Sequence, residues 1–115
     1  MVSRRDLTAG LQAAQMAHAL HEFLEEHPQQ YRTWYNESKH IVLLSVGNEQ
    51  ELIALCDRLK LLGISFSCFN EPDLCNQLTS ICVEPTDRAT RYLSHLPLAL
   101  REYDKWPSAL KGHGD

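Results

Sequence analysis

The sequence predicts an α/β domain of three layers, with helices on both faces of a four-stranded mixed sheet whose last strand runs antiparallel. Three observations support this fold class. Apolar residues recur at helical spacing over residues 9–26, and residues 40–46 form a continuous apolar run rich in β-branched side chains. Only about eight residues separate two further strand-like segments, 64–69 and 78–83. This gap is too short for a crossover helix, so these two strands are expected to be antiparallel.

The first half of the chain is expected to contain two strands and two helices. Residues 1–5 form a brief strand, and a helix capped by Thr8 runs from about residue 9 to residue 26. A proline ends it, and residues 29–36 form a short second helix. Residues 40–46 should be a central strand covered on both faces. The expected buried face of the first helix carries Ala13, Met16, Ala17, Leu20 and Leu24.

The second half begins with a helix whose two ends carry clear signals. Asn48 opens it, with Glu51 spaced as in a capping box, and Gly63 stops it. After the antiparallel pair, a final helix begins near Pro85 and Asp87 and continues to about residue 95. The apolar stripe of the helix that follows Asn48 consists of Leu52, Leu55, Leu59 and Leu62.

The 115-residue chain has the size of a single domain, and its 43% hydrophobic content is ordinary for a packed core. We expect the domain to span residues 1–96, followed by a partly flexible extension over residues 97–115 whose last five residues fray. No stretch approaches the roughly 20 apolar residues that cross a bilayer. The amino end also lacks the apolar segment of a secretion signal. The sequence therefore predicts a cytoplasmic protein without a membrane span.

The charge of the chain argues against a general nucleic-acid binder. The formal net charge is -4 at pH 7, whereas such proteins gain most of their affinity from Lys and Arg that neutralise phosphates. The distribution is uneven, because residues 1–85 contain 6 basic and 11 acidic side chains and residues 86–115 contain 5 and 4. Any basic surface is therefore expected to be local.

The four cysteines are separated by 12, 7 and 7 residues, without the Cys-x-x-Cys pair of a zinc or redox motif. We expect reduced and mostly buried thiols, with the loop residue Cys75 as the reactive one. The segment His21-Glu-Phe-Leu-Glu25 resembles the start of the zinc-protease motif His-Glu-x-x-His, but Glu25 occupies the position of the second histidine. The sequence therefore predicts no metal site.

Ligands of such folds usually bind outside the carboxyl ends of the parallel strands. In this chain those ends correspond to residues 6–10, 46–48 and 69–73. The first contains Gly10 at the start of a helix, whose free N–H groups favour an anion. The alternative is an ordinary strand-to-helix turn that needs a small residue. One glycine without a Lys or Arg beside it does not decide between the two.

His18 is a candidate general base on the first helix. Helical spacing places it one turn after Gln15 and one turn before Glu22, so the three side chains point in one direction. A neutral imidazole can accept a proton near pH 7, with a carboxylate fixing its tautomer. The alternative is an ordinary histidine–glutamate pair on the helix surface.

The loop over residues 70–77 is a second candidate site. It gathers two carboxylates, Glu71 and Asp73, and several amides, among them Asn76, between two buried strands. Polar loops on a rigid sheet often carry function. Pro, Asp and Asn are also ordinary turn residues, so both interpretations stay open.

Five short motifs occur together in one protein family. They are Arg5-Asp-Leu, Ala13-Ala-Gln-x-x-His-Ala19, Glu49-x-Glu-Leu-Ile-Ala-Leu55, Lys60-x-Leu-Gly63 and Thr79-x-x-x-x-x-Pro85. Over about residues 3–96 the chain resembles the type II peptidyl-tRNA hydrolases, the archaeal and eukaryotic class, and the Ala-Ala-Gln-x-x-His-Ala string is the most specific part. The resemblance implies a four-stranded mixed sheet between helices. It also implies hydrolysis of the ester that joins a peptide to the terminal ribose of tRNA, without a metal or organic cofactor.

The resemblance also implies roles for individual residues. His18 or Glu71 would prepare the attacking water, and Thr79 would hydrogen-bond the reacting centre. Gln15 and Asn76 would orient the substrate. Three further positions are expected at the substrate-binding surface, Gly10, Gln12 and Asp73.

Two departures from the family pattern leave a second function open. The chain has Gly10-Leu-Gln12 where lysines normally follow the glycine and face the substrate phosphates, and the loop after the third strand is shorter. Loss of a lysine–phosphate contact lowers affinity for tRNA. The alternative is a catalytically inactive member that binds RNA or protein, with a homodimer as a candidate assembly. Four arginines are candidates to replace the lysines, Arg4, Arg5, Arg88 and Arg91.

Overall fold

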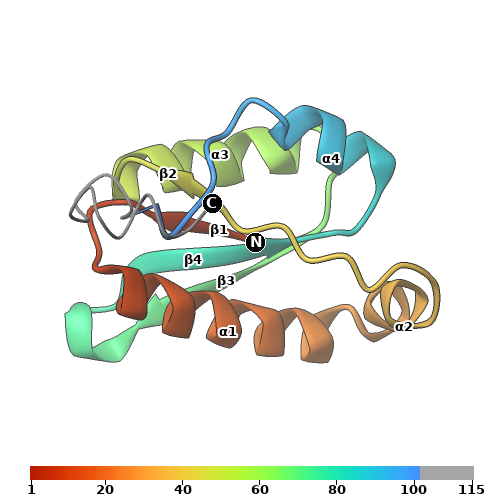
Figure 1. The fold of residues 1–115 in the computed structure, drawn as a ribbon, viewed down its shortest axis with the longest axis horizontal. Helices are drawn as coiled ribbons and strands as arrows, with labels where there is room; N and C mark the ends of the chain where they lie inside the picture. Colours follow the sequence, from red (N-terminus) through yellow and green to blue (C-terminus); the bar gives the residue numbers. More distant parts are fainter. Residues whose placement is uncertain (102–115) are drawn as a thin grey trace, which may run out of the picture.

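The computed structural model describes residues 1–101, which form four α-helices and a four-stranded sheet (Figure 1). The helices are α1 (Ala9–Glu26), α2 (Pro28–Glu37), α3 (Glu49–Leu61) and α4 (Asp87–Leu93), and a 3₁₀ turn covers Pro72–Leu74. The strands are β1 (Val2–Arg4), β2 (Leu44–Val46), β3 (Phe66–Glu71) and β4 (Gln77–Val83). Within these residues, no helix combines the length and the apolar character that crossing a membrane requires.

The sheet has the strand order β2-β1-β4-β3 and lies between two layers of helices. β1 and β2 are parallel, whereas β4 is antiparallel to both of its neighbours, β1 and β3. α1 covers one face of the sheet, and α3 and α4 cover the other (Figure 1). The predicted three-layer fold and its antiparallel last strand are therefore confirmed.

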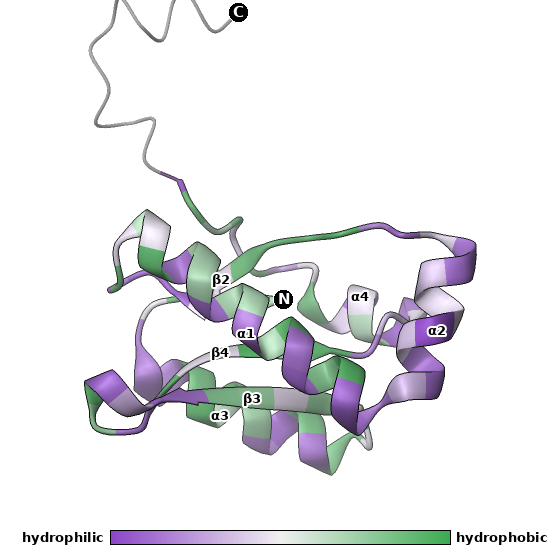
Figure 2. Cartoon of the chain, turned by 90° about the horizontal axis from the view of Figure 1, so that it is seen from below, coloured by the Kyte–Doolittle hydropathy of each residue, from purple (hydrophilic) through white to green (hydrophobic). Residues whose placement is uncertain are grey.

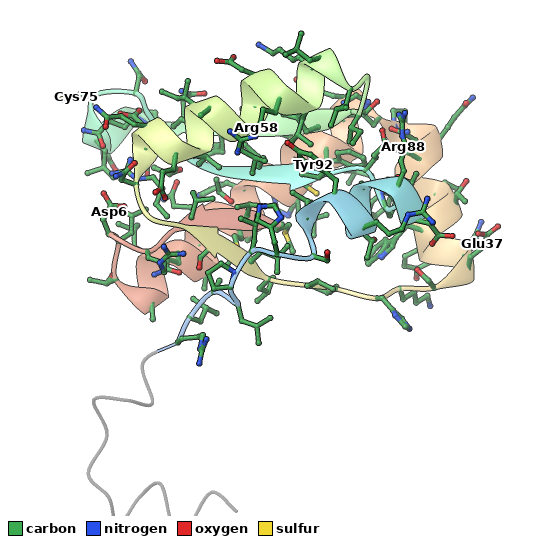
Figure 3. All side chains as sticks on the ribbon, turned by 90° about the horizontal axis from the view of Figure 1, so that it is seen from above. Asp6, Glu37, Arg58, Cys75, Arg88 and Tyr92 are labelled. Atoms are coloured by element: carbon green, nitrogen blue, oxygen red, sulfur yellow. The ribbon has the colours of Figure 1, made fainter. Side chains whose placement is uncertain are left out.

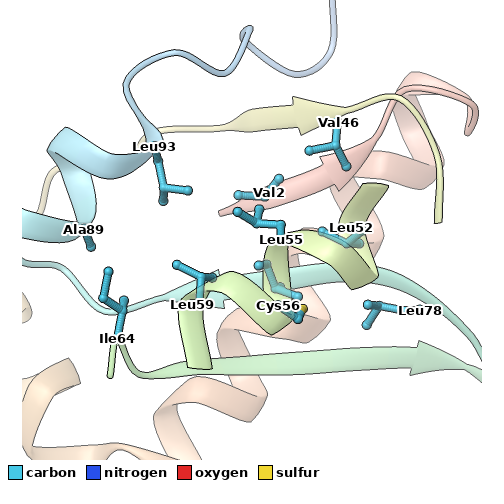
Figure 4. Close-up of a cluster of buried hydrophobic side chains, with 11 residues drawn as sticks. Val2, Val46, Leu52, Leu55, Cys56, Leu59, Ile64, Leu78, Ala89 and Leu93 are labelled. Atoms are coloured by element: carbon cyan, nitrogen blue, oxygen red, sulfur yellow. The ribbon is translucent and has the colours of Figure 1, made fainter. Parts of the chain in front are cut away.

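The hydrophobic core lies mainly between the sheet and the layer formed by α3 and α4 (Figure 4). Leu52, Leu55 and Leu59 of α3 are fully buried there, as the predicted stripe requires. Leu62, the last member of that stripe, is exposed because it follows the end of α3. A smaller cluster on the opposite face packs Phe23 of α1 against β4.

The predicted helix ends are confirmed. The Thr8 side chain accepts a hydrogen bond from the Leu11 N–H at the start of α1, and the Asn48 Oδ1 accepts one from the Glu51 N–H at 2.9 Å. Gly63 follows α3 with a φ of 68°, a left-handed conformation that glycine adopts at low cost.

The buried face of α1 is not the one predicted. Three of the expected core positions are exposed, Ala13, Ala17 and Leu24. The helix instead buries two glutamines, Gln12 and Gln15. Both sets of positions have helical spacing, so periodicity alone does not choose between them. The glutamines are stable inside because each of them forms hydrogen bonds there.

The strand expected over residues 40–46 is shorter than predicted and is not central. β2 begins only at Leu44, and it lies at one end of the sheet order. Ile41 and Val42 are 59% and 51% exposed, in the apolar segment that connects α2 to β2 (Figure 2). The central strands are β1 and β4 instead. An apolar run predicts burial on both faces only where the run lies inside a sheet, and residues 40–43 lie outside it.

Residues 97–101 run along the outer side of β2 and reach the start of α1. The Ser45 N–H donates to the Pro97 carbonyl at 2.9 Å, and the Ala99 N–H donates to the Leu43 carbonyl at 2.8 Å. The Leu100 N–H then donates to Gln12 Oε1 at 3.4 Å. The predicted frayed end, and most of the predicted extension, fall on residues 102–115, outside the described residues.

The cysteines are less buried than predicted. Cys56 and Cys82 are buried, whereas Cys68 and Cys75 are exposed. A hydrogen bond from the Cys56 thiol and the nearby Lys60 lower the pKa of Cys68, although partial desolvation of its sulfur by neighbouring atoms opposes them. We therefore expect Cys68 to be a reactive thiol as well, because the thiolate is the nucleophile.

We expect iodoacetamide at neutral pH to modify Cys68 before Cys75. Intact-protein mass spectrometry followed by peptide mapping measures the two rates. A Cys56→Ala variant should slow modification of Cys68 and leave Cys75 unchanged, because it removes the hydrogen bond to the Cys68 sulfur. Faster labelling of Cys75 in the unaltered protein would contradict this assignment.

Candidate active site

One end of the sheet collects most of the predicted site residues. The carboxyl ends of β1 and β3 and the beginning of β4 lie there, beside the first half of α1 (Figure 1). Asp6 after β1 and Cys75 in the β3–β4 turn mark this end of the molecule in Figure 3. This is the edge that the strand order predicts for a ligand.

Three of the predicted residues form a continuous hydrogen-bonded group, which we call the polar cluster: Gln15, Glu71 and Thr79. The Thr79 hydroxyl donates to Gln15 Oε1 at 2.6 Å, and Gln15 Nε2 donates to Glu71 Oε1 at 3.3 Å. Thr79 and Gln15 are 0% and 1% exposed, whereas Glu71 is partly exposed. The cluster therefore links the interior of the domain to a carboxylate at the surface.

A β-bulge places Thr79 in this cluster. Phe69 of β3 pairs with Ser80 and Asn70 pairs with Leu78, so Thr79 is the extra residue on β4. Its hydroxyl lies 2.6 Å from Gln15 Oε1 and 3.3 Å from the Phe69 carbonyl oxygen. Bulges commonly redirect a side chain next to an active site. Neither the spacing nor the composition of the strand predicts such an irregularity.

His18 lies beside the polar cluster but outside its hydrogen bonds. Its imidazole stacks on the Phe69 ring, with centroids 4.4 Å apart and an interplanar angle of 14°, and the residue is exposed. The two ion pairs within residues 1–101 join Arg4 to Asp6 and Arg88 to Glu84, so no His18–Glu22 pair forms there. Stacking thus orients the ring in place of a carboxylate.

Three further predicted positions are exposed on α1 and on the turn between β3 and β4. Gly10 is exposed in the first turn of α1, and a Cβ atom at this position would meet nothing within 4 Å. Packing therefore does not require a glycine there. Asp73 is exposed in the 3₁₀ turn that follows Glu71. Asn76 is exposed in a left-handed conformation, and its N–H donates to the Glu71 carbonyl at 2.9 Å.

Gln12 is buried, and both polar atoms of its side-chain amide form hydrogen bonds. Nε2 donates to the Leu7 carbonyl at 2.7 Å, and Oε1 accepts from the Leu100 N–H at 3.4 Å. The side chain thereby joins the β1–α1 turn to residues 97–101. This connection is an observation that the sequence did not predict.

Arg4 is a structural residue of this edge that the sequence presented only as a surface cation. It is buried, and its Nε and Nη2 donate to the two Asp6 carboxylate oxygens at 2.9 and 2.8 Å. Its Nη1 donates to Gln77 Oε1 at 3.0 Å and to the Leu78 carbonyl at 3.1 Å. Arg4 therefore ties the end of β1 to the beginning of β4, directly before Thr79.

Two cavities on the described part of the chain bear on the site. The first, which we call the α1-start cavity, has a volume of about 390 Å³ and is lined by Arg5, Asp6, Leu7, Thr8, Gln12, Leu98, Leu100 and Arg101. The second, the α2 cavity, measures about 700 Å³ and is mostly apolar, with Phe23, Tyr31 and Trp34 in its wall. It contains no residue of the polar cluster.

Comparison with known protein families identifies the family of this chain. The model of the family described as peptidyl-tRNA hydrolase PTH2 matches residues 1–99. The chain belongs to this family. The resemblance found in the sequence is thereby confirmed, and at the level of the family the function is peptidyl-tRNA hydrolysis. No curated protein matches the chain.

In this member of the family, the four candidate arginines occupy different places. Arg4 is engaged by Asp6, as described above. Arg88 donates to the Gly63 carbonyl at 2.6 Å, and it lies at the opposite end of the molecule from Asp6 (Figure 3). Arg91 is exposed in the last turn of α4. Of the four, Arg5 is therefore the one that lines a cavity at the candidate site.

Proposed function

We propose that this chain hydrolyses the ester between a peptide and the 3′-terminal ribose of tRNA, with Glu71 as the general base. The observation that supports this most is the hydrogen-bonded sequence from Thr79 through Gln15 to Glu71. Apolar packing does not require the buried polar side chains of Thr79 and Gln15. Their hydrogen bonds do serve to orient the Glu71 carboxylate.

The proposed reaction begins with a water molecule beside Glu71. The carboxylate accepts a proton as the water oxygen attacks the ester carbonyl carbon, which gives a tetrahedral intermediate. The intermediate collapses as the bond to the ribose oxygen breaks, and the protonated Glu71 returns its proton to that oxygen. Asn76, exposed on the same turn, is our candidate for a donor to the ester carbonyl oxygen.

We assign the role of base to Glu71 in preference to His18. Gln15 fixes one carboxylate oxygen of Glu71, so its other oxygen has a defined direction. His18 is held by stacking on Phe69, and we propose that this pair of rings contacts the substrate next to the ester. Flat rings suit an adenine or a peptide side chain.

Thr79 and Gln15 are proposed as positioning residues, because both are buried and act through Glu71. The other predicted positions are proposed on the substrate side. Gly10 leaves the start of α1 open, Asp73 lies on the turn after Glu71, and Gln12 holds the adjoining segment in place. A homodimer stays a prediction, which sedimentation equilibrium of the full chain checks.

Replacing Thr79 with Val should lower kcat roughly tenfold and leave KM within about twofold. Val has the shape of Thr but cannot donate to Gln15, so Gln15 loses the bond that fixes its orientation. A Thr79→Ser variant keeps the hydroxyl and should recover most of kcat. A Thr79→Val variant with unchanged kcat, or a Ser variant as impaired as the Val variant, would exclude a positioning role for the hydroxyl.

The test of the function itself uses the full chain with N-acetyl-aminoacyl-tRNA and with deacylated tRNA. Hydrolysis is measured as release of the N-acetyl amino acid, and binding as retention of labelled tRNA. Release with multiple turnovers supports the proposed hydrolase. Binding of both RNAs without release would select the inactive, RNA-binding alternative.

A further inference from the structure

We infer that the peptide of the substrate binds as an added strand along the outer edge of β3, with its carboxyl end at Glu71. The inference rests on the proposed function, because it assigns the part of the site that holds the peptide. It starts from the strand order, in which β3 is the last strand. Within residues 1–101, β3 pairs with β4 on one side and with no strand on the other.

The backbone contacts of β3 show which of its residues face β4. The carbonyl oxygens of Ser65, Phe69 and Glu71 lie 2.9 to 3.3 Å from donors on β4 and on the residues directly before and after it. In an antiparallel ladder, successive residues direct their backbone groups to opposite sides of the strand. The alternate residues of β3, whose N–H and carbonyl groups therefore point away from the sheet, are Phe66, Cys68 and Asn70.

The outer edge of β3 lacks the features that usually prevent another strand from pairing. Proteins protect such edges with charged side chains, prolines or bulges. Residues 66–70 are Phe-Ser-Cys-Phe-Asn, without a charged residue or a proline. The bulge beside Phe69 inserts its extra residue, Thr79, into β4, so the outer edge of β3 is continuous. An edge of this kind can accept an extended peptide as a further strand.

The direction of β3 fits a substrate whose ester lies at the polar cluster. β3 ends at Glu71, the proposed base. A peptide whose C-terminal carbonyl lies there, and whose chain follows β3, runs parallel to the strand. The distance from Phe66 to Glu71 along β3 is roughly 17 Å, at about 3.3 Å for each residue. About four or five residues of the peptide can therefore pair with this edge.

Uncharged surfaces and aromatic rings border the edge on the two faces of the sheet. On the face covered by α1, the Phe69 ring is stacked on His18. On the other face, Cys68 and Asn70 are exposed. Alternate side chains of an added strand would contact these two surfaces. The main-chain hydrogen bonds do not depend on the peptide sequence, which suits a substrate whose peptide varies.

Amide hydrogen exchange of the full chain tests the added strand. The ligands are non-hydrolysable 3′-amide analogues of N-acetyl-peptidyl adenosine that carry one or four alanines. We expect the four-residue analogue to slow exchange at the Cys68 and Asn70 amides by roughly tenfold or more, and the one-residue analogue to leave them fast. The Ser67 and Phe69 amides, which face β4, should exchange slowly with and without ligand and serve as internal controls.

The dissociation constants of the two analogues provide a second measurement. The four-residue analogue should bind roughly tenfold more tightly, the effect of about one to three net hydrogen bonds. N-methylation of the peptide amides that face β3, which are every second one, should remove this gain, whereas N-methylation of the alternate amides should preserve it. A Cys68→Pro variant loses the outward N–H but no bond to β4, so its gain should be smaller than that of Cys68→Ala. The unfolding temperature of each variant verifies the fold.

Two results would overturn the proposal. One is equal binding of the two analogues together with unchanged exchange at Cys68 and Asn70. The other is slow exchange of these amides in the free chain that increases with protein concentration, because a second copy of the chain would then occupy the edge.

Hydrolysis of N-acetyl-aminoacyl-tRNA separates this proposal from the proposed function. If the chain cleaves the ester but binds the two analogues equally, the peptide-binding edge is wrong and the proposed function stands. If the chain cleaves no ester but binds the four-residue analogue more tightly with slowed exchange at β3, the proposed function is wrong and the peptide-binding edge stands.

Discussion

Replacing Glu71 with Gln should lower the turnover of N-acetyl-aminoacyl-tRNA by about 10² to 10⁴, the usual contribution of a positioned general base. Gln has nearly the shape of Glu, and its amide oxygen can still accept the bond from Gln15 Nε2. It cannot accept a proton from water. Steady-state release of the N-acetyl amino acid measures the effect, and the unfolding temperature of the variant verifies that the fold is retained.

The matched control for this prediction is His18→Gln, which removes the other candidate base on the same side of the sheet. If the imidazole serves as a contact surface stacked on Phe69, this variant should change KM more than kcat. A loss of kcat in His18→Gln as large as that expected for Glu71→Gln, with Glu71→Gln still active, would transfer the role of base to His18.

Replacing Arg4 with Met should lower the free energy of unfolding by about 2–3 kcal/mol. Met retains most of the volume but removes four hydrogen bonds, which leaves the buried Leu78 carbonyl and the Gln77 amide without their partner. Most of the loss should come from these neutral groups. Asp6 is 42% exposed, so solvent screens its part of the ion pair.

Urea denaturation measures this loss, and an unchanged m-value would show that the unfolded state is unaffected. Arg58→Met is the control, because that exposed arginine forms one hydrogen bond, to the Tyr92 hydroxyl at 3.0 Å. It should cost well under about 1 kcal/mol. Equal losses in the two variants would mean that Arg4 does not tie β1 to β4.

The Arg4–Asp6 pair also predicts how the stability depends on pH. The hydrogen bonds from Arg4 lower the pKa of Asp6 below its usual value of 3.8. A carboxyl group whose pKa is depressed in the folded state stabilises the fold above its unfolded pKa, and this contribution is lost as the pH falls through the folded pKa. The difference in stability between the unaltered protein and Arg4→Met should therefore be constant near neutral pH and narrow below about pH 3.8.

The sequence predicted features that depend on neighbouring residues. The N-caps Thr8 and Asn48 and the stop at Gly63 follow from local backbone chemistry, and they are where the sequence placed them. The short connection between β3 and β4 likewise required an antiparallel pair. Such features can be predicted without knowing how the rest of the chain folds.

Features that depend on distant partners were missed. Gln15 was expected on a polar row, yet it is buried because Thr79 and Glu71, more than 50 positions away, provide its hydrogen bonds. β2 was expected at the centre of the sheet, but residues 97–100 cover its outer side. The bulge that aims Thr79 at Gln15 has no signature in the order of residues along β4.

The residues of the polar cluster were nevertheless all candidates in the sequence. Gln15 and Thr79 belong to two motifs of the family, and Glu71 lies in the polar loop over residues 70–77. The structure adds their order, with Thr79 innermost and Glu71 at the surface.

The central claim is that the ester end of the substrate binds at the polar cluster. An ¹⁵N-labelled protein titrated with a non-hydrolysable 3′-amide analogue of N-acetyl-aminoacyl adenosine tests it most directly. The account predicts the largest chemical-shift changes at the Gln15 side-chain amide and the Glu71 backbone amide. The indole N–H of Trp34, which donates to the His40 carbonyl at 2.7 Å in the wall of the α2 cavity, should not shift. Movement of the Trp34 signal with Gln15 unchanged would contradict the account.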